Sequence, residues 1–342
     1  MACCRWAYSG DDAEAVRRLA GSADWGEFLT ACRRHRVQGL AWHALSKLGI
    51  YLPSPVQIVL AGDARSIAEQ GLQSASESAR LAAAFQAAGI PLLFLKGLTV
   101  GKLAYDNPFV KMGWDIDLLV APEDLSRSAD LLGELGYGLS IPAEPVRLAR
   151  WHQSWKESIW RRADGIVVEL HTRVADQPEL LPLVGVSSSA QTVSIAPGIA
   201  LQTLADEVLF AYLCVHGASS AWFRLKWLAD LAGFLNRFDA DAIDLLYERS
   251  QELGAGRAPA QALFLAHWLF AVPVSAALAQ RLNSWSNNWL ARSALRDMLQ
   301  AEPNERLLGT RNIHLTQFFL LAGAGYKLSE LKRQVRHAID ML

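Results

Sequence analysis

Two aspartates stand at the start of a short apolar segment, residues 115–120. Side chains on a strand alternate between faces, so Asp115 and Asp117 point the same way while Ile116 points the other way. Two carboxylates on one face repel each other and are costly to desolvate without a counter-charge. Mg²⁺ accepts hard oxygen ligands of this kind and is usually completed by substrate phosphates. The spacing therefore predicts a metal site; the alternative is a strand end with two solvated aspartates.

A third acid, Glu169, lies on a later predicted strand, in phase with His171 and Arg173. If the two strands pair in one sheet, Glu169 can lie beside the aspartates and complete a three-carboxylate cluster. Three acids suit two metal ions about 4 Å apart, which hold the attacking and leaving oxygens of a phosphoryl displacement. The alternative is a carboxylate at a hairpin edge that pairs with Arg161 or Arg173. His171, one strand step further on the same face, is a candidate for contact with substrate or with the metal ligands.

A glycine turn upstream is the candidate phosphate-binding element. Residues 91–95 form a continuous apolar run typical of a buried strand, Lys96 and Gly97 follow, and 98–105 is a predicted helix. Glycine lets backbone N–H groups approach a phosphate closely, and a helix N-terminus favours negative charge. We therefore expect Lys96 and Gly97 to orient phosphates.

The elements that position these residues form a short mixed segment between helical flanks. Apolar side chains recur at helical spacing through residues 11–89, and Ser54 with Pro55 is a good helix start. The middle segment is predicted to hold strands at 91–95 and 115–120, helices at 98–105 and 122–135, and a hairpin of 156–162 with 165–173.

The remainder of the chain is predicted to be helical. The expected helices are 201–216, 221–238, 240–253, 259–270, 287–300 and 313–322, with a last one near the C-terminus. The fold class is therefore α+β, a small mixed β-sheet flanked by N- and C-terminal helical lobes. The expected domains are 1–89, an N-terminal helical region; 90–180, the α/β core; and 181–342, a C-terminal helical domain.

Composition narrows the class of partner. The 342 residues include 33 basic and 34 acidic side chains, a formal net charge of −1, and 51% are hydrophobic. This balance describes a globular chain and argues against a broad basic surface for a long nucleic acid. The four cysteines form no C-x-x-C pair, and the first ten residues lack the apolar core of a signal peptide. We therefore expect a cytoplasmic protein.

One stretch, residues 262–279, is almost entirely apolar. His267 and Pro273 interrupt it, and a spanning helix needs about 20 apolar residues, so we interpret it as a buried bundle helix. The mean hydropathy of +0.13 leaves room for a peripheral membrane contact or an oligomer interface.

Taken in chain order, several short motifs resemble the uncharacterised nucleotidyltransferase family of the DNA polymerase β superfamily. They are Phe94-Leu95-Lys96-Gly97, Leu103-Ala104-Tyr105, Asp115-Ile116-Asp117-Leu118-Leu119-Val120, Glu169-Leu170-His171 and Arg224-Leu225-Lys226-Trp227-Leu228-Ala229-Asp230. The resemblance covers roughly residues 92–235. The N- and C-terminal parts match only in being helical.

The resemblance implies a nucleotidyltransferase of the polymerase β type. A glycine-containing turn would cradle the phosphates of an NTP such as ATP, and Asp115, Asp117 and Glu169 would bind Mg²⁺, as two ions that Mn²⁺ could replace. A nucleoside monophosphate would pass to a hydroxyl or phosphate of a small-molecule, peptide or protein acceptor, with release of pyrophosphate. The resemblance also makes Arg224 and Lys226 candidates for contact with the triphosphate.

The chain departs from the family pattern in three places. The usual Gly-Ser pair is Gly97-Leu98, so Thr99 is the nearest substitute hydroxyl. The position that is often arginine before the aspartates is Lys111, which supplies a point charge without a bidentate fork. Trp114 stands where a small residue is common. Two alternatives stay open: transfer of another phosphorylated group, such as a sugar phosphate, at the same metal site, or a degenerate nucleotide- or partner-binding module.

Overall fold

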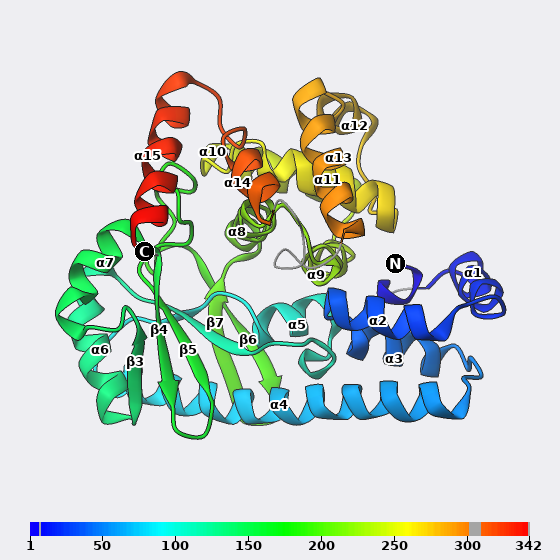
Figure 1. Cartoon of the computed structure of the whole chain (residues 1–342), viewed down its shortest axis with the longest axis horizontal. Coiled ribbons are helices and arrows are strands. Elements are labelled where there is room, and N and C mark those ends of the chain that lie inside the picture. Colours follow the sequence, from blue (N-terminus) through cyan, green and yellow to red (C-terminus); the bar gives the residue numbers. More distant parts are fainter. Residues whose placement is uncertain (7, 301–308, 341–342) are drawn as a thin grey trace.

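A mixed five-stranded sheet forms the centre of the computed structural model, which describes residues 1–6, 8–300 and 309–340 (Figure 1). Its strands are β1 (Leu93–Phe94), β2 (Asp115–Leu119), β3 (Tyr137–Ile141), β4 (Glu157–Arg162) and β5 (Val167–His171). Their order across the sheet is β1-β2-β5-β4-β3. Strands β2 and β5 are parallel, and the other neighbours are antiparallel. The predicted hairpin is therefore confirmed as β4 and β5, and the α+β fold class is confirmed.

The two faces of the sheet pack against different cores. Ile116 and Leu118 of β2 join the smaller core with Phe85 of the long helix α4 (Ser54–Ala87). Leu119 belongs to the larger core, which the C-terminal helices dominate. Because side chains alternate along β2, Asp117 shares the face of Leu119. The acidic face of the sheet is thus turned toward the C-terminal helices.

The N-terminal part is helical, as predicted. Its helices are α1 (Gly10–Ala20), α2 (Trp25–His35), α3 (Gln38–Lys47) and α4. Helix α4 begins at the predicted Ser54-Pro55 start and runs 34 residues. In Figure 1 it runs beneath both the sheet and the N-terminal helices, so it joins the two regions.

Short helices connect the strands. Helix α5 (Leu98–Tyr105) follows β1, the 3₁₀ turn η2 (Pro108–Val110) precedes β2, α6 (Leu125–Glu134) joins β2 to β3, and α7 (Leu148–Ser154) precedes β4. Strand β3 lies in a span that the sequence analysis left irregular. As an edge strand it pairs only with β4 and alternates weakly, which explains why its pattern was missed.

The C-terminal part is a group of packed helices. They are α8 (Asp206–Ser219), α9 (Leu225–Leu235), α10 (Ala240–Glu252), α11 (Ala258–Phe270), α12 (Ala276–Leu282), α13 (Trp285–Leu299), α14 (Arg311–Gln317) and α15 (Ala324–Asp340). The apolar stretch near 262 is the largely buried helix α11, as predicted. No helix within the described ranges is both long and apolar enough to cross a membrane.

Three predicted boundaries are wrong. Residues 201–204 belong to β7 (Ile199–Leu204), which forms a hairpin with β6 (Ala190–Ala196), because burial there alternates with a period of two. Helix α9 starts at Leu225 and not at 221, since Ala221 and Trp222 adopt left-handed backbone with φ of 47° and 52°. The predicted helix 313–322 ends early, at Gln317.

The larger core joins side chains from all three predicted segments, among them Leu45, Tyr105 and Phe234. Burial of apolar surface therefore ties the helical flanks to the sheet segment. The domain boundaries at 89/90 and 180/181 stay a prediction.

Candidate functional site

The register of β2 and β5 sets two acids side by side. Asp117 is directly opposite Glu169 in the parallel pair. One donor atom each of Asp117, Glu169 and His171 lies within 4.8 Å of the other two. Asp117 is 2% exposed, whereas Asp115 is partly exposed at the start of the strand. The strand pairing on which the three-carboxylate cluster depended is therefore present, with Asp117 at its centre.

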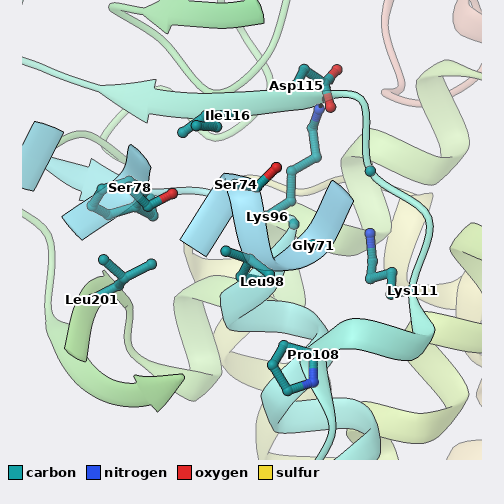
Figure 2. Close-up of a pocket in the computed structure, with 13 residues that line it drawn as sticks. Gly71, Ser74, Ser78, Lys96, Leu98, Pro108, Lys111, Asp115, Ile116 and Leu201 are labelled. Carbon is teal, nitrogen blue, oxygen red and sulfur yellow. Dashed lines mark ion pairs between the residues drawn. The ribbon is translucent and has the colours of Figure 1, made fainter. Parts of the chain in front are cut away.

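Lys96 contacts all three predicted metal-binding acids. Its Nζ lies 2.5 Å from Asp117 Oδ1, 3.6 Å from Glu169 Oε2 and 3.9 Å from Asp115 Oδ2. Figure 2 shows the lysine side chain extending toward Asp115. Burial disfavours the ammonium ion, but the carboxylates outweigh it and hold the pKa of Lys96 well above its usual value. Lys96 thus supplies a counter-charge to the cluster.

His171 joins the same network. Its Nε2 lies 3.2 Å from Asp117 Oδ1, 3.6 Å from Glu169 Oε2 and 3.4 Å from Glu157 Oε2. Burial and Lys156 oppose the imidazolium, yet the neighbouring acids, with Glu157 first, raise the pKa of His171 to about 9. Glu157 is a fourth acid that the sequence analysis missed. It is opposite His171 in the β4–β5 register, so only the order of the strands reveals it.

The acidic cluster fits a divalent cation. Asp117 Oδ2 is buried and has no hydrogen-bond partner, which is costly for a carboxylate oxygen. Oxygen ligands from neighbouring strands are the donors that Mg²⁺ accepts. The position of the Lys96 ammonium against the same oxygens is a further sign that this space favours positive charge. Binding of Mg²⁺ stays a prediction.

The glycine turn opens onto the same place. Gly97 caps the N-terminus of α5 with φ of 75°, a conformation that side chains with a Cβ rarely adopt. A Cβ there would meet no atom within 4 Å, so the turn faces free space. The first N–H groups of α5 lack helical partners and are available to an anion. Thr99 does not replace the missing serine hydroxyl, because it is buried and donates to the Lys96 carbonyl.

Between the sheet and the helices lies one pocket that collects most of the predicted residues. Its polar and aromatic lining is Arg36, Lys96, Lys111, Trp114, Asp115, Asp117, His216, Lys226, Trp227 and Asp230, with Gly97 at the turn. Helices α8 and α9 form the wall opposite β2. The pocket therefore has acids on the strand side and several cations around it.

Lys111 is already paired. Its Nζ lies 3.2 Å from Asp230 Oδ2, and Tyr105 donates to Asp230 Oδ1 at 3.0 Å. All three side chains are buried. The backbone just before Lys111 is held against α3, since a Cβ on Gly39 would meet the Val110 carbonyl oxygen at 2.2 Å.

Lys226 has no such partner. Within the described residues no carboxylate lies within ion-pair distance of its ammonium group; its Nζ lies 6.0 Å from the centre of the Trp227 ring. Burial, then the charge on Lys111, lowers the pKa of Lys226 to about 7. Asp230 is four residues away, but it is buried and bound to Lys111, so the surface pair weighed from the sequence does not form.

Arg36 is a cation of this pocket that the sequence analysis missed. It follows α2 and adopts left-handed backbone with φ of 57°. Nonglycine residues held this way are uncommon and cluster at functional sites. The basic run Arg33-Arg34-His35-Arg36 was the available signal, although it lies far from the sheet in sequence.

Four predicted residues do not line this pocket: Glu169 and His171 belong to the acidic cluster with Asp117, whereas Arg173 and Arg224 hydrogen-bond to backbone carbonyls. Arg173 follows β5 and donates to the Gln153 carbonyl at 3.5 Å. Arg224 precedes α9 and donates to the Arg34 carbonyl at 2.7 Å. The structure does not bring these two arginines to the acidic residues, and their contact with a triphosphate stays a prediction.

A smaller pocket lies on the other side of Lys96 and is lined by α4. Gly71, Ser74 and Ser78 line it together with Lys96 and Asp115 (Figure 2). These three α4 residues recur at three- and four-residue spacing, so they share one face of the helix. Ser74 thus brings a hydroxyl to the side of the turn where Leu98 replaces serine.

Comparison with known families agrees with the geometry. The family described as an uncharacterised nucleotidyltransferase matches residues 21–271, which is more than half of the chain. No curated protein matches the chain. The match extends beyond the motifs into the N-terminal helices and through α11, and so includes Arg36 and the whole helical wall of the pocket. The chain therefore belongs to the uncharacterised nucleotidyltransferase family.

Proposed function

We propose that this protein transfers a nucleoside monophosphate from an NTP, ATP among them, to a hydroxyl or phosphate of an acceptor and releases pyrophosphate, a reaction of the 2.7.7 class of transferases. The observation that carries the proposal is the register pair of Asp117 and Glu169 beside a pocket with several cations. Acids on one wall and cations on the other suit a metal-bound triphosphate.

Asp115, Asp117 and Glu169 would hold Mg²⁺ on the strand wall, as two ions or with Mn²⁺ in their place. A divalent ion bound there would polarise the phosphate oxygens and stabilise their developing charge. Lys96 contacts the same carboxylates, and although burial opposes the charged form of Asp117, the ammonium group holds the pKa of Asp117 well below its usual value.

Gly97 and Lys226 would bind the phosphates from the other sides. The first N–H groups of α5 lack helical partners and would bind the anion, and the left-handed backbone of Gly97 creates the turn. Lys226 lines the pocket without an acidic partner, so its charge is available to the triphosphate. Arg36 adds a second cation there.

The reaction needs a group that accepts the acceptor's proton. Burial raises the pKa of Glu169 to about 7, which suits a general base near neutral pH. The acceptor oxygen bonds to the α-phosphorus, the bond from phosphorus to the pyrophosphate oxygen breaks, and the proton passes to Glu169. The near-neutral charge of the chain favours a small-molecule, peptide or protein acceptor.

Two labelling experiments test the proposal. Each NTP is incubated with the protein, Mg²⁺ and fractionated cell extract, in one experiment with the label at the α-phosphorus and in the other with the label at the γ-phosphorus. We expect α-label to enter an acceptor with equimolar release of pyrophosphate. Incorporation of γ-label alone would indicate a phosphoryl transfer and contradict the proposal. Incorporation of neither label from any fraction would contradict it as well.

A further inference from the structure

Helix α15 packs with its polar face inward. Glu330 is 0% exposed and accepts bonds from Arg333 Nε at 2.8 Å and from Gln334 Nε2 at 2.6 Å. Gln177 donates to the same carboxylate at 3.4 Å, and Arg333 also contacts Gln317. A buried charge that is fully hydrogen-bonded holds its element in one orientation. The polar network therefore fixes which face of α15 is turned to solvent.

The outward face of α15 is apolar. Leu328, Leu331, Val335 and Ile339 are 54%, 49%, 51% and 64% exposed. They recur at three- and four-residue spacing, so they form one stripe along the helix. Helices of globular proteins normally turn such a stripe toward the core. The reversed arrangement leaves a continuous apolar surface without a partner in the described part of the chain.

Basic side chains border this stripe on both sides. On a helical projection Lys327 lies along one edge, and Lys332 and Arg336 lie along the other. All three are exposed, whereas the acid Glu330 is turned inward. Of the α15 side chains that the structure describes, the exposed charged ones are thus all basic, although the whole chain carries a formal charge of −1.

We propose that α15 binds the surface of an anionic lipid bilayer, lying in the interface with its apolar stripe among the acyl chains. Lys and Arg beside an apolar face are typical of interfacial helices, because their charges meet acidic headgroups while the stripe is buried. The helix has 17 residues, and Figure 1 shows it (red) at one edge of the molecule, where a flat surface can reach it.

A second copy of the chain fits this face less well. The buried centres of protein interfaces are depleted of lysine, yet Lys327 and Lys332 stand directly beside the stripe. A second α15 would also bring its own three cations against them, and like charges repel. An anionic bilayer satisfies both the apolar stripe and its basic border.

Co-sedimentation of the full-length protein with vesicles tests this proposal. We expect binding to vesicles of phosphatidylglycerol with phosphatidylcholine, weaker binding in high salt, and none to phosphatidylcholine alone. The variant Leu331→Glu should weaken binding at least about tenfold. Leu245→Glu is the matched control, since Leu245 is an exposed leucine (70%) on another helix, α10, and binding should not change.

A charge variant keeps the test informative even if Leu331→Glu disturbs folding. Lys332→Glu combined with Arg336→Glu should lower vesicle binding at least about tenfold while the circular dichroism spectrum stays native. Equal binding by this variant, or equal binding to neutral vesicles, would overturn the proposal. The proposal would also be overturned if light scattering detected a dimer that does not bind vesicles and that Leu331→Glu dissociates. A second copy of the chain would then cover the face.

Discussion

The two walls of the pocket balance their charges in different ways. On the strand wall, Asp117 and Glu169 face Lys96 and His171, so acids and cations neutralise one another. On the helical wall, Asp230 of α9 pairs with Lys111 from the turn before β2, but Lys226 has no paired acid among the described residues. The strand wall is therefore suited to exchange one cation for another, whereas the helical wall offers an anion a lysine that no acid has paired.

The largest expected effect comes from the strand wall. Asp117→Asn removes a carboxylate that faces Lys96 and His171, and we expect nucleotidyl transfer to fall about 10³-fold. Rates of α-label incorporation with saturating NTP measure the loss. Asp106→Asn is the matched control, because Asp106 is exposed outside the pocket and asparagine tolerates its left-handed backbone. A loss below tenfold for Asp117→Asn would show that the strand wall does not carry the chemistry.

A substitution on the helical wall should lower the stability of the fold. Asp230→Asn leaves the buried ammonium group of Lys111 without its counter-ion, and breaking a buried pair this way costs about 3 kcal/mol of unfolding free energy. Urea denaturation at pH 7 measures the change. Asp164→Asn, on an exposed residue paired with Arg162, should cost much less, because solvent screens an exposed pair. Similar losses for both variants would mean that the helical wall does not depend on this pair.

The turn between the walls should respond in nucleotide affinity. Gly97→Ala forces a Cβ onto backbone with φ of 75°, which costs about 1–2 kcal/mol unless the turn changes shape. We expect NTP to bind about tenfold more weakly. Equilibrium titration with a nonhydrolysable NTP measures this. Gly133→Ala, in α6 with open space around it and no left-handed backbone, should leave the affinity unchanged.

The smallest effect concerns protons. The pKa of Lys226 is lowered to about 7, so above that pH its amine is mostly neutral in the free protein. A triphosphate beside it favours the ammonium ion and raises this pKa, so binding should take up a proton and weaken as pH rises above 7. Calorimetry in buffers with different heats of ionisation measures the uptake.

Lys226→Arg is the matched variant for the proton effect. Arginine stays charged at every working pH, so the variant should bind NTP at pH 8 without proton uptake. Undiminished uptake in Lys226→Arg would assign the proton to another group and remove Lys226 from the account.

The strand wall could be predicted further than the helical wall. Period-two alternation in residues 115–120 put both aspartates on one face, and the same rule placed Glu169 in phase with His171. Glu157 was not predicted, because its place beside His171 depends on the register of a further strand. Alternation along one strand determines which face of the sheet a side chain lies on, but only the pairing of strands determines which side chains are its neighbours.

The helical wall depends on contacts between segments far apart in sequence. Arg36 reaches the pocket from the end of α2, and Lys111 finds Asp230 across more than a hundred residues. Spacing along the chain could not indicate either. The same limit applies to β7, where the apolar residues of 199–204 suited helix and strand equally until their pairing with β6 was known.

Equilibrium binding of a nonhydrolysable NTP, measured with Mg²⁺ and again with EDTA, tests the central claim that acids of the strand wall hold a metal-bound triphosphate. The account predicts that Mg²⁺ tightens binding at least about tenfold in the wild type and has no effect in the double variant Asp115→Asn with Asp117→Asn. Binding that is indifferent to Mg²⁺ in the wild type, or that keeps its full Mg²⁺ dependence in the double variant, would contradict it.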